Sequence, residues 1–349
     1  MNNGSNKTST IKLIQKIIAP IITMGLLTFL IWKFEPGKIA GSMSQVNFWY
    51  LLGAFGIILL IFLLKTLRWH YILKRMGVKI KWNKTLWLIF IGMFGAAITP
   101  SKVGDVIKAH YLSKWTGRSE TDTFFSAILD RITDLAAVAV YSSIAIPFFF
   151  DPLGNVVKWA VFGGILIIAV LVLLMFNDKT VKLIFTLLAK MKKSKKKQES
   201  VEESEDEQSP KFSANRIIDE YYANLVFFSK TNYIIIFSIS FVIWLLLGLQ
   251  ASLLLLGMNS TIQLGDIILV MTGIITIAAV VALIPISISG IGIRDATIAL
   301  LAVFSLGILP EVAISVSFIQ TILNVFIPAL IGGGLLLMVR KKKKRENTS

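Results

Sequence analysis

The chain has 349 residues, of which 55% are hydrophobic and 16% are charged, and it contains no cysteine. A soluble protein of this length cannot bury such an apolar fraction, so the composition excludes that class and indicates an all-α, polytopic membrane protein. The formal net charge of +16 does not indicate a nucleic-acid partner, because the Lys and Arg residues gather beside apolar runs, where they favour one membrane face.

The first apolar run, 17–32, follows a polar start and is expected to be the first membrane span. A basic start before a short apolar core is also typical of a signal peptide, but the flank after residue 32 has no small-residue cleavage site. The second expected span is 48–67. The segment 68–84 follows it and is rich in Lys and Arg, which is typical of a cytoplasmic loop.

The next apolar run, 86–98, is short for a span, since a spanning helix needs about 20 residues. It ends at the break Thr99-Pro-Ser-Lys-Val-Gly-Asp105, which contains proline, glycine and the charged residues Lys102 and Asp105, with Lys108 one turn later. We predict a broken hairpin over 86–118 that enters the membrane from the cytoplasm and returns there. The alternative is an ordinary span followed by an amphipathic helix on the membrane surface.

The apolar stretch 123–146 is long enough to span and contains Asp130-Arg-Ile-Thr-Asp134. Residues four apart share a helix face, so Asp130 and Asp134 point the same way, and Arg131 lies about 100° around the helix from Asp130. Three ionisable residues in one turn of a membrane helix are costly unless they are paired or hydrated, and such residues usually serve a function. A short outer turn at 148–155 should follow, and 156–176 should span back inward.

Residues 177–230 differ in kind from the rest of the chain. A basic block at 192–197 and an acidic block at 199–207 stand there without periodic apolar residues, which is typical of a disordered cytoplasmic linker. A regulatory role, or contact of the basic block with a lipid surface, is the alternative to a solvated tether.

A second break lies between the expected span 233–256 and the last expected span 312–339. It reads Pro285-Ile-Ser-Ile-Ser-Gly-Ile-Gly-Ile-Arg-Asp295 and falls inside a predicted outer hairpin, 266–306. In hydrocarbon, a proline–glycine break is tolerated only where the freed backbone groups face protein or water. The helix N-terminus behind the glycine turn should present free N–H groups to an anion, next to Arg294. We interpret the break as half of a substrate site; the alternative is a structural kink with Arg294 extended towards the membrane surface.

The basic segments predict a protein of the cell membrane with both termini in the cytoplasm. About six full crossings plus two hairpins satisfy that topology. The segments then pair into two units of span, hairpin and span that run in opposite directions, an inverted repeat whose hairpin tips meet near the membrane midplane. The predicted divisions are an N-terminal membrane half (1–176), the linker (177–230), a C-terminal membrane half (231–339) and a basic cytoplasmic tail (340–349).

Three sequence elements occur in an order that resembles the lysylphosphatidylglycerol synthase transmembrane region family, the flippase-like integral membrane proteins. They are Pro100-Ser-Lys-Val-Gly-Asp105, Asp130-Arg131 with Asp134, and Gly290-Ile-Gly-Ile-Arg-Asp295. The family pattern usually has glutamate where Asp105, Asp130 and Asp295 stand. The resemblance covers about 13–339 and implies lipid translocation, in bifunctional relatives of aminoacyl-phosphatidylglycerol. Those relatives carry a soluble transferase domain after the membrane region; this sequence ends at Ser349, so we expect no synthase activity.

The leading hypothesis is therefore a lipid translocase, not an enzyme, for a lipid with an anionic or phosphate-containing head group, a phospholipid or a polyprenyl-phosphate-linked sugar. The cations of the site would contact the phosphate as the head group passes between the hairpins, and its carboxylates would hold those cations when the site is empty, or exchange protons. No nucleotide motif or metal-ligand spacing is present, so we expect no nucleotide and no cofactor. The predicted substrate site comprises Lys102, Asp105, Lys108, Asp130, Arg131, Asp134, Gly290, Gly292, Arg294 and Asp295.

Two other classes of function stay open at this point. A membrane-embedded enzyme acting on lipid-linked substrates would need a nucleophile or a metal site, and the carboxylates have neither metal-ligand spacing nor a base partner such as His close to them in the sequence. Another secondary transporter, a channel or a structural scaffold is the remaining class, but charges flanking two helix breaks argue against an inert scaffold.

Overall fold

The computed structural model describes residues 24–25, 28, 36–99, 103–149, 159, 162–163, 166, 229–258, 264–284 and 287–346. Every regular element within these residues is a helix, as the composition predicted. The expected first span, the expected span 156–176 and the charged linker lie wholly or largely outside the described residues. The first described helix, α3 (Pro36–Ser44), is short and packs against the helix that begins at Pro310.

Helix α4 (Phe48–Arg75) has 28 residues and begins where the side chain of Asn47 accepts a hydrogen bond from the amide of Trp49 at 3.0 Å. The predicted span 48–67 is therefore confirmed as a helix, but the prediction that a loop begins at Arg68 is wrong. No glycine or proline interrupts 68–75, so the helix continues to Arg75 and ends shortly before Gly77, whose φ of 69° leaves the helical conformation.

Both predicted hairpins consist of two helices joined by a break. The first contains α5 (Trp82–Ala97), the 3-10 turn η2 (Val103–Val106) and α6 (Ile107–Thr116). The second contains α12 (Leu264–Val281) and α13 (Ile293–Leu306). The helix–break–helix pattern is thus confirmed at both places, whereas the depth and orientation of the hairpins in a membrane stay predictions.

Long helices flank the hairpins. They are α7 (Glu120–Phe149), α11 (Lys230–Met258) and a last helix that runs as α14 (Pro310–Thr321), the π-helical segment η4 (Ile322–Phe326) and α15 (Ile327–Glu346). Among the described residues, three helices are long and apolar enough to cross a membrane: α4, α11 and 310–339. The full number of crossings stays a prediction.

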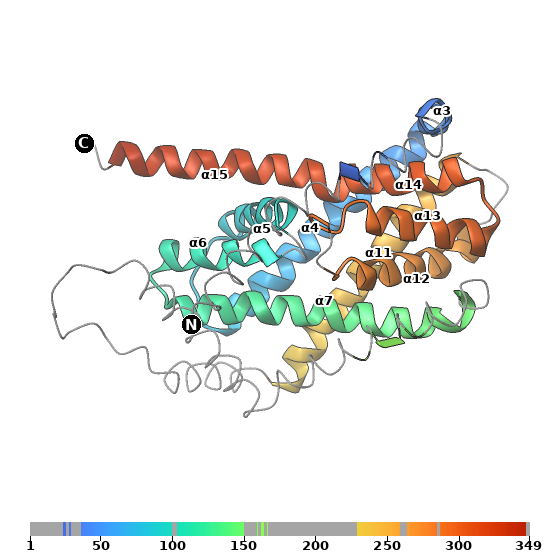
Figure 1. Ribbon diagram of the computed structural model, residues 1–349. Coiled ribbons are helices and arrows are strands. Elements are labelled where there is room, and N and C mark those ends of the chain that lie inside the picture. Colours follow the sequence, from blue (N-terminus) through green and yellow to red (C-terminus); the bar gives the residue numbers. More distant parts are fainter. Residues whose placement is uncertain are drawn as a thin grey trace, which may run out of the picture.

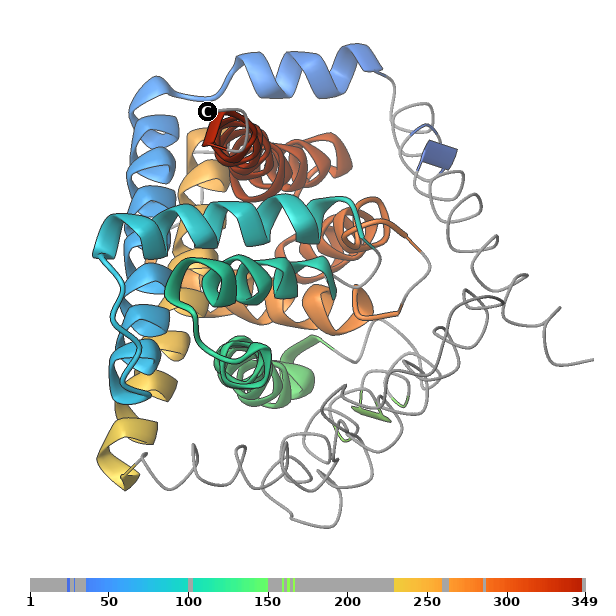
Figure 2. The same ribbon diagram turned by 90° about the vertical axis from the view of Figure 1, so that its left-hand side faces the viewer.

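Three pairs of helices make the most extensive contacts between the two halves of the chain (Figures 1 and 2). Helix α4 runs beside α11, α5 of the first hairpin lies against α15, and α12 of the second hairpin lies against α7. Each hairpin therefore packs against the last long helix of the other half, α15 or α7. The outward face of α4 carries exposed apolar side chains, such as Leu59 and Leu63, as expected of a helix that faces lipid.

Candidate functional site

The tips of the two hairpins touch. The backbone amide of Ser289 donates a hydrogen bond of 3.1 Å to the carbonyl oxygen of Thr99. The first tip is closed by its own bonds, because the amide of Gly104 donates to the hydroxyl of Thr99 at 2.8 Å and that hydroxyl donates to the carbonyl of Gly95 at 2.9 Å. A Cβ on Gly95 would collide with the Gly104 carbonyl. The two tips are therefore in contact, as predicted, whereas their position near the membrane midplane stays a prediction.

A buried arginine joins α4 to α7 beside these tips. The Nε atom of Arg68 lies 2.8 Å from one carboxylate oxygen of Asp130, and its NH1 atom lies 2.5 Å from Asp134. The same NH1 donates to the hydroxyl of Ser240 on α11 at 2.6 Å, and Arg68 is only 1% exposed. Asp130 and Asp134 do share a helix face, as predicted, and their common partner is a residue that the sequence analysis had placed in a cytoplasmic loop.

The first hairpin adds two more charges to this cluster. The ammonium of Lys108 lies 3.0 Å from Asp105 and 2.6 Å from Asp130, so it links the hairpin to α7. Arg131 directs both its Nε and its NH2 to one oxygen of Asp105, at 2.9 and 2.7 Å. Arg68, Lys108, Asp105 and Asp130 are all buried, and buried charges are stable only with partners of this kind.

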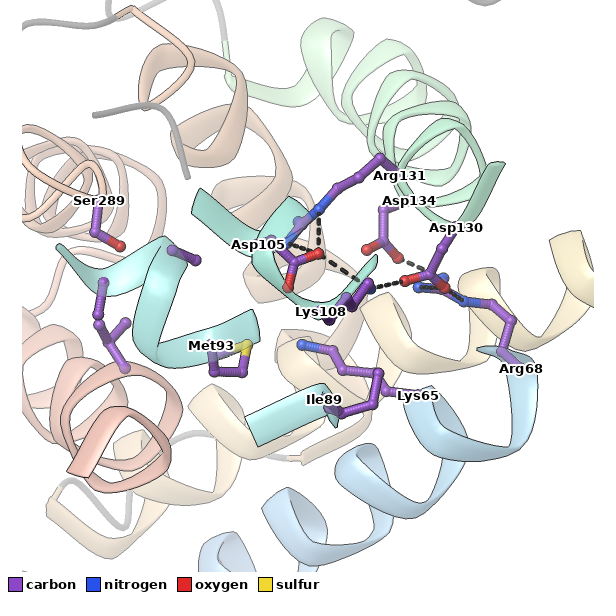
Figure 3. Close-up of a pocket in the computed structure, with 13 residues that line it drawn as sticks. Lys65, Arg68, Ile89, Met93, Asp105, Lys108, Asp130, Arg131, Asp134 and Ser289 are labelled. Carbon is purple, nitrogen blue, oxygen red and sulfur yellow. Dashed lines mark hydrogen bonds and ion pairs between the residues drawn. The ribbon is translucent and has the colours of Figure 1, made fainter. Parts of the chain in front are cut away.

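A cavity lies against this network, with a volume of about 60 Å³, several times the roughly 10–15 Å³ that a cavity needs to hold one water molecule. Its polar wall holds the charged cluster together with Lys65 of α4, and Ser289 brings the tip of the second hairpin to its edge (Figure 3). Its apolar wall comes from both halves of the chain, and consists of Ile89, Met93, Ala96, Ala97 and Val325.

The second hairpin holds its charges in a separate group. The Asp295 carboxylate accepts hydrogen bonds from the hydroxyls of Ser317 and Thr321, each at 2.6 Å, and from the amide of Gly292 at 2.9 Å. Arg294 binds Asp295 and Thr321, and its buried Nε has no partner among the described residues. The residues described as lining the cavity do not include Arg294, Asp295, Gly290 or Gly292.

The N-terminus of α13 is partly capped by residues of its own turn. The N-terminus of α13 was expected to offer free N–H groups to a substrate anion, but Asp295 of the same helix already caps the Gly292 amide. The amides of Arg294 and Ala296 likewise donate to the carbonyls of Gly290 and Gly292. The physical reason is that an aspartate three residues into a helix can bend back onto the amide that precedes the helix. Gly290 and Gly292 have φ values of 76° and 86°, so they shape the turn.

Of the remaining predicted cations, Lys102 lies outside the described residues, and Lys108 is engaged by two carboxylates. The sequence analysis missed Lys65 and Arg68. A usable signal was present, because Lys65 stands inside the predicted span 48–67, where an ionisable residue marks a functional site by default. Arg68 is three residues later and therefore shares its helix face.

The arrangement does not resemble a metal centre. No group of three or more His, Asp or Glu side chains in the described part of the chain could hold a metal ion. His70 instead contacts the Thr85 hydroxyl at 3.0 Å, and His110 contacts Glu120 at 3.2 Å.

Comparison with known proteins gives a consistent result. The sequence profile described as the lysylphosphatidylglycerol synthase TM region matches residues 16–332. Similar chains include the UPF0104 membrane proteins of Methanocaldococcus jannaschii, 22% identical, and of Pyrococcus horikoshii, 24% identical. These matches cover 92% and 91% of this chain and 94% and 96% of the relatives. The UPF0104 membrane protein of Methanothermobacter thermautotrophicus is 22% identical, over 90% of this chain.

Proposed function

We propose that this chain, which belongs to the lysylphosphatidylglycerol synthase transmembrane region family, moves lipids with an anionic or phosphate-containing head group between membrane leaflets. The observation that carries the proposal is the cavity with four cations at the place where the two hairpin tips meet. A lipid head group that crosses a bilayer needs such a polar binding site within the protein, because hydrocarbon offers its charges no partner.

The lining of the cavity supports an amphiphilic substrate. Arg131 is the cluster's most accessible cation, with 34% of its side chain exposed, and its NH1 is not engaged by Asp105. A guanidinium is well suited to grip phosphate oxygens. The opposite wall is apolar and would accept the glycerol and the start of an acyl chain. Because the cavity is small in this conformation, passage of a whole head group requires the hairpins to part.

The packing supports an inverted repeat as the basis of transport. The contact of α5 with α15 and the contact of α12 with α7 are the two equivalent contacts that a pseudo-twofold axis between the halves would generate. In such repeats the substrate site lies near the membrane midplane, between discontinuous helices, and the halves rock around it. We infer about six full crossings, with both termini in the cytoplasm, from the basic segments.

A membrane-embedded enzyme is less well supported. Each carboxylate of the cluster is engaged by an arginine or a lysine, with distances of 2.5 to 3.0 Å. These ion pairs hold the carboxylates against cations, and neither described histidine lines the cavity to serve as a general base beside them. We propose that the chain binds and moves lipid without making or breaking covalent bonds.

Reconstitution tests the proposal. Purified protein in liposomes should make fluorescent phosphatidylglycerol of the inner leaflet accessible to a membrane-impermeant quencher, whereas protein-free liposomes should not. Lipids extracted afterwards should keep their masses. A change in lipid mass would support the enzyme instead, and quenching confined to the outer leaflet with folded protein present would contradict translocation.

A further inference from the structure

Lys65 differs from the other charged residues of the cavity. Its side chain points into the cavity from α4 (Figure 3), and its ammonium makes no ion pair within the described part of the chain. The ammonium lies over the ring of Phe62, 5.8 Å from the ring centroid. By contrast, Arg68, Lys108 and Arg131 all lie within 3.0 Å of a carboxylate.

The charges that line the cavity do not cancel. Four cations and three carboxylates are among its described lining residues, which leaves one net positive charge. Three of the cations, Arg68, Lys108 and Arg131, form ion pairs with the three carboxylates. The cation left without a carboxylate partner among the described residues is Lys65. A positive charge in a low-dielectric site is costly without a counter-charge, and an anion bound beside Lys65 would supply one.

We infer that Lys65 receives the phosphate of the lipid and makes this site select net-anionic head groups over aminoacylated ones; the inference rests on the proposed function of the cavity. Phosphatidylglycerol carries one negative charge and neutralises the site. Lysyl-phosphatidylglycerol carries the same phosphate plus two amino groups, so its head group is net positive and adds charge to a cavity that is already positive. Like charges in such a site repel strongly, so attachment of an amino acid should weaken binding.

The geometry gives Lys65 this role in preference to its neighbours. Lys108 is 1% exposed and lies between Asp105 and Asp130, so a phosphate could reach it only by displacing a carboxylate. Arg68 is equally buried and holds three partners. Only Arg131, among these three, has an exposed part, and it would contact the same phosphate from the α7 side while it remains on Asp105.

The test measures lipid binding and not transport, so that it can fail independently of the proposed function. Full-length protein in detergent would be offered phosphatidylglycerol and lysyl-phosphatidylglycerol in equal amounts, and the retained lipid would be read by native mass spectrometry. The variants are Lys65→Gln, which removes the charge, Lys65→Arg, which keeps it, and Lys74→Gln as an exposed lysine of the same helix.

The wild type and Lys74→Gln should retain phosphatidylglycerol at least tenfold more than its lysyl derivative. Lys65→Gln should lower phosphatidylglycerol binding about tenfold or more and remove the preference, because a hydrogen bond between charged groups is lost, while Lys65→Arg should keep both. Equal retention of the two lipids by the wild type, or unchanged selection in a folded Lys65→Gln variant, would overturn the inference even if the protein translocates lipid. If the protein selects phosphatidylglycerol but does not move it, the proposed function fails and the inference about binding stands.

Discussion

Ser289 and Thr99, from the two broken hairpins, are joined by a backbone hydrogen bond of 3.1 Å. Ser289 also lines the charged cavity, so this bond closes the space between the tips at the edge of the candidate site. A head group that leaves the cavity between the hairpins must separate these two residues.

The first prediction concerns the stability of the buried charge network. Arg68→Ala should lower the free energy of unfolding by about 3–5 kcal/mol, because it leaves Asp130 and Asp134 buried without their shared partner. Arg75→Ala, on the exposed end of the same helix, should cost less than about 1 kcal/mol although it removes a hydrogen bond to Tyr71. Thermal unfolding in detergent measures both. Equal melting temperatures for the two variants would contradict the buried role of Arg68.

The second prediction uses a matched pair of glycines on α15. A Cβ on Gly332 would collide with the carbonyl of Phe90 on α5, whereas a Cβ on Gly334 would meet open space. Gly332→Ala should therefore destabilise the protein by about 1–3 kcal/mol, and Gly334→Ala should stabilise it by about 0.5–1 kcal/mol through helix propensity. In thermal unfolding, the melting temperature should fall for Gly332→Ala and rise for Gly334→Ala. A stabilising Gly332→Ala would mean that α5 does not lie against α15.

The third prediction concerns the accessible cation of the cluster. Arg131→Ala should abolish translocation in proteoliposomes, because it removes a phosphate ligand and leaves Asp105 with Lys108 alone. Arg131→Lys should restore part of the activity, since one ammonium cannot contact Asp105 and a phosphate with the geometry of a guanidinium. Arg118→Ala is the control: its guanidinium is exposed and donates a hydrogen bond of 2.9 Å to the Gly77 carbonyl. A stable Arg131→Ala variant with wild-type rates would remove Arg131 from the site.

The fourth prediction concerns topology. Helix α4 has 28 residues and is about 42 Å long at 1.5 Å per residue, more than the ~30 Å hydrocarbon core, so its ends should lie on opposite sides. In this cysteine-free chain, Gln45→Cys should react with an impermeant maleimide in intact cells, and Lys79→Cys only after permeabilisation. The reverse pattern would place the basic end outside.

The sequence predicted more of the fold than of the site. Apolar run lengths and the two proline–glycine breaks indicated the helices and both hairpins, because those signals are local. The partners in the cluster are set by packing between helices far apart in the chain, and no local pattern reveals them. Arg68 illustrates the limit, since the end of an apolar run was taken as the end of a helix. Asp295 is a second case, because its partners Ser317 and Thr321 lie on α14, more than 20 residues away along the chain.

The most direct test of the account is to lock the two hairpin tips together reversibly. Thr99→Cys and Ser289→Cys, introduced together into this cysteine-free chain, should form a cross-link under oxidising conditions because their backbones are hydrogen-bonded. We predict that the oxidised double variant in proteoliposomes stops moving phosphatidylglycerol, that dithiothreitol restores movement, and that each single variant is insensitive to oxidation. Wild-type rates in the fully cross-linked protein would contradict passage of the head group between the hairpins.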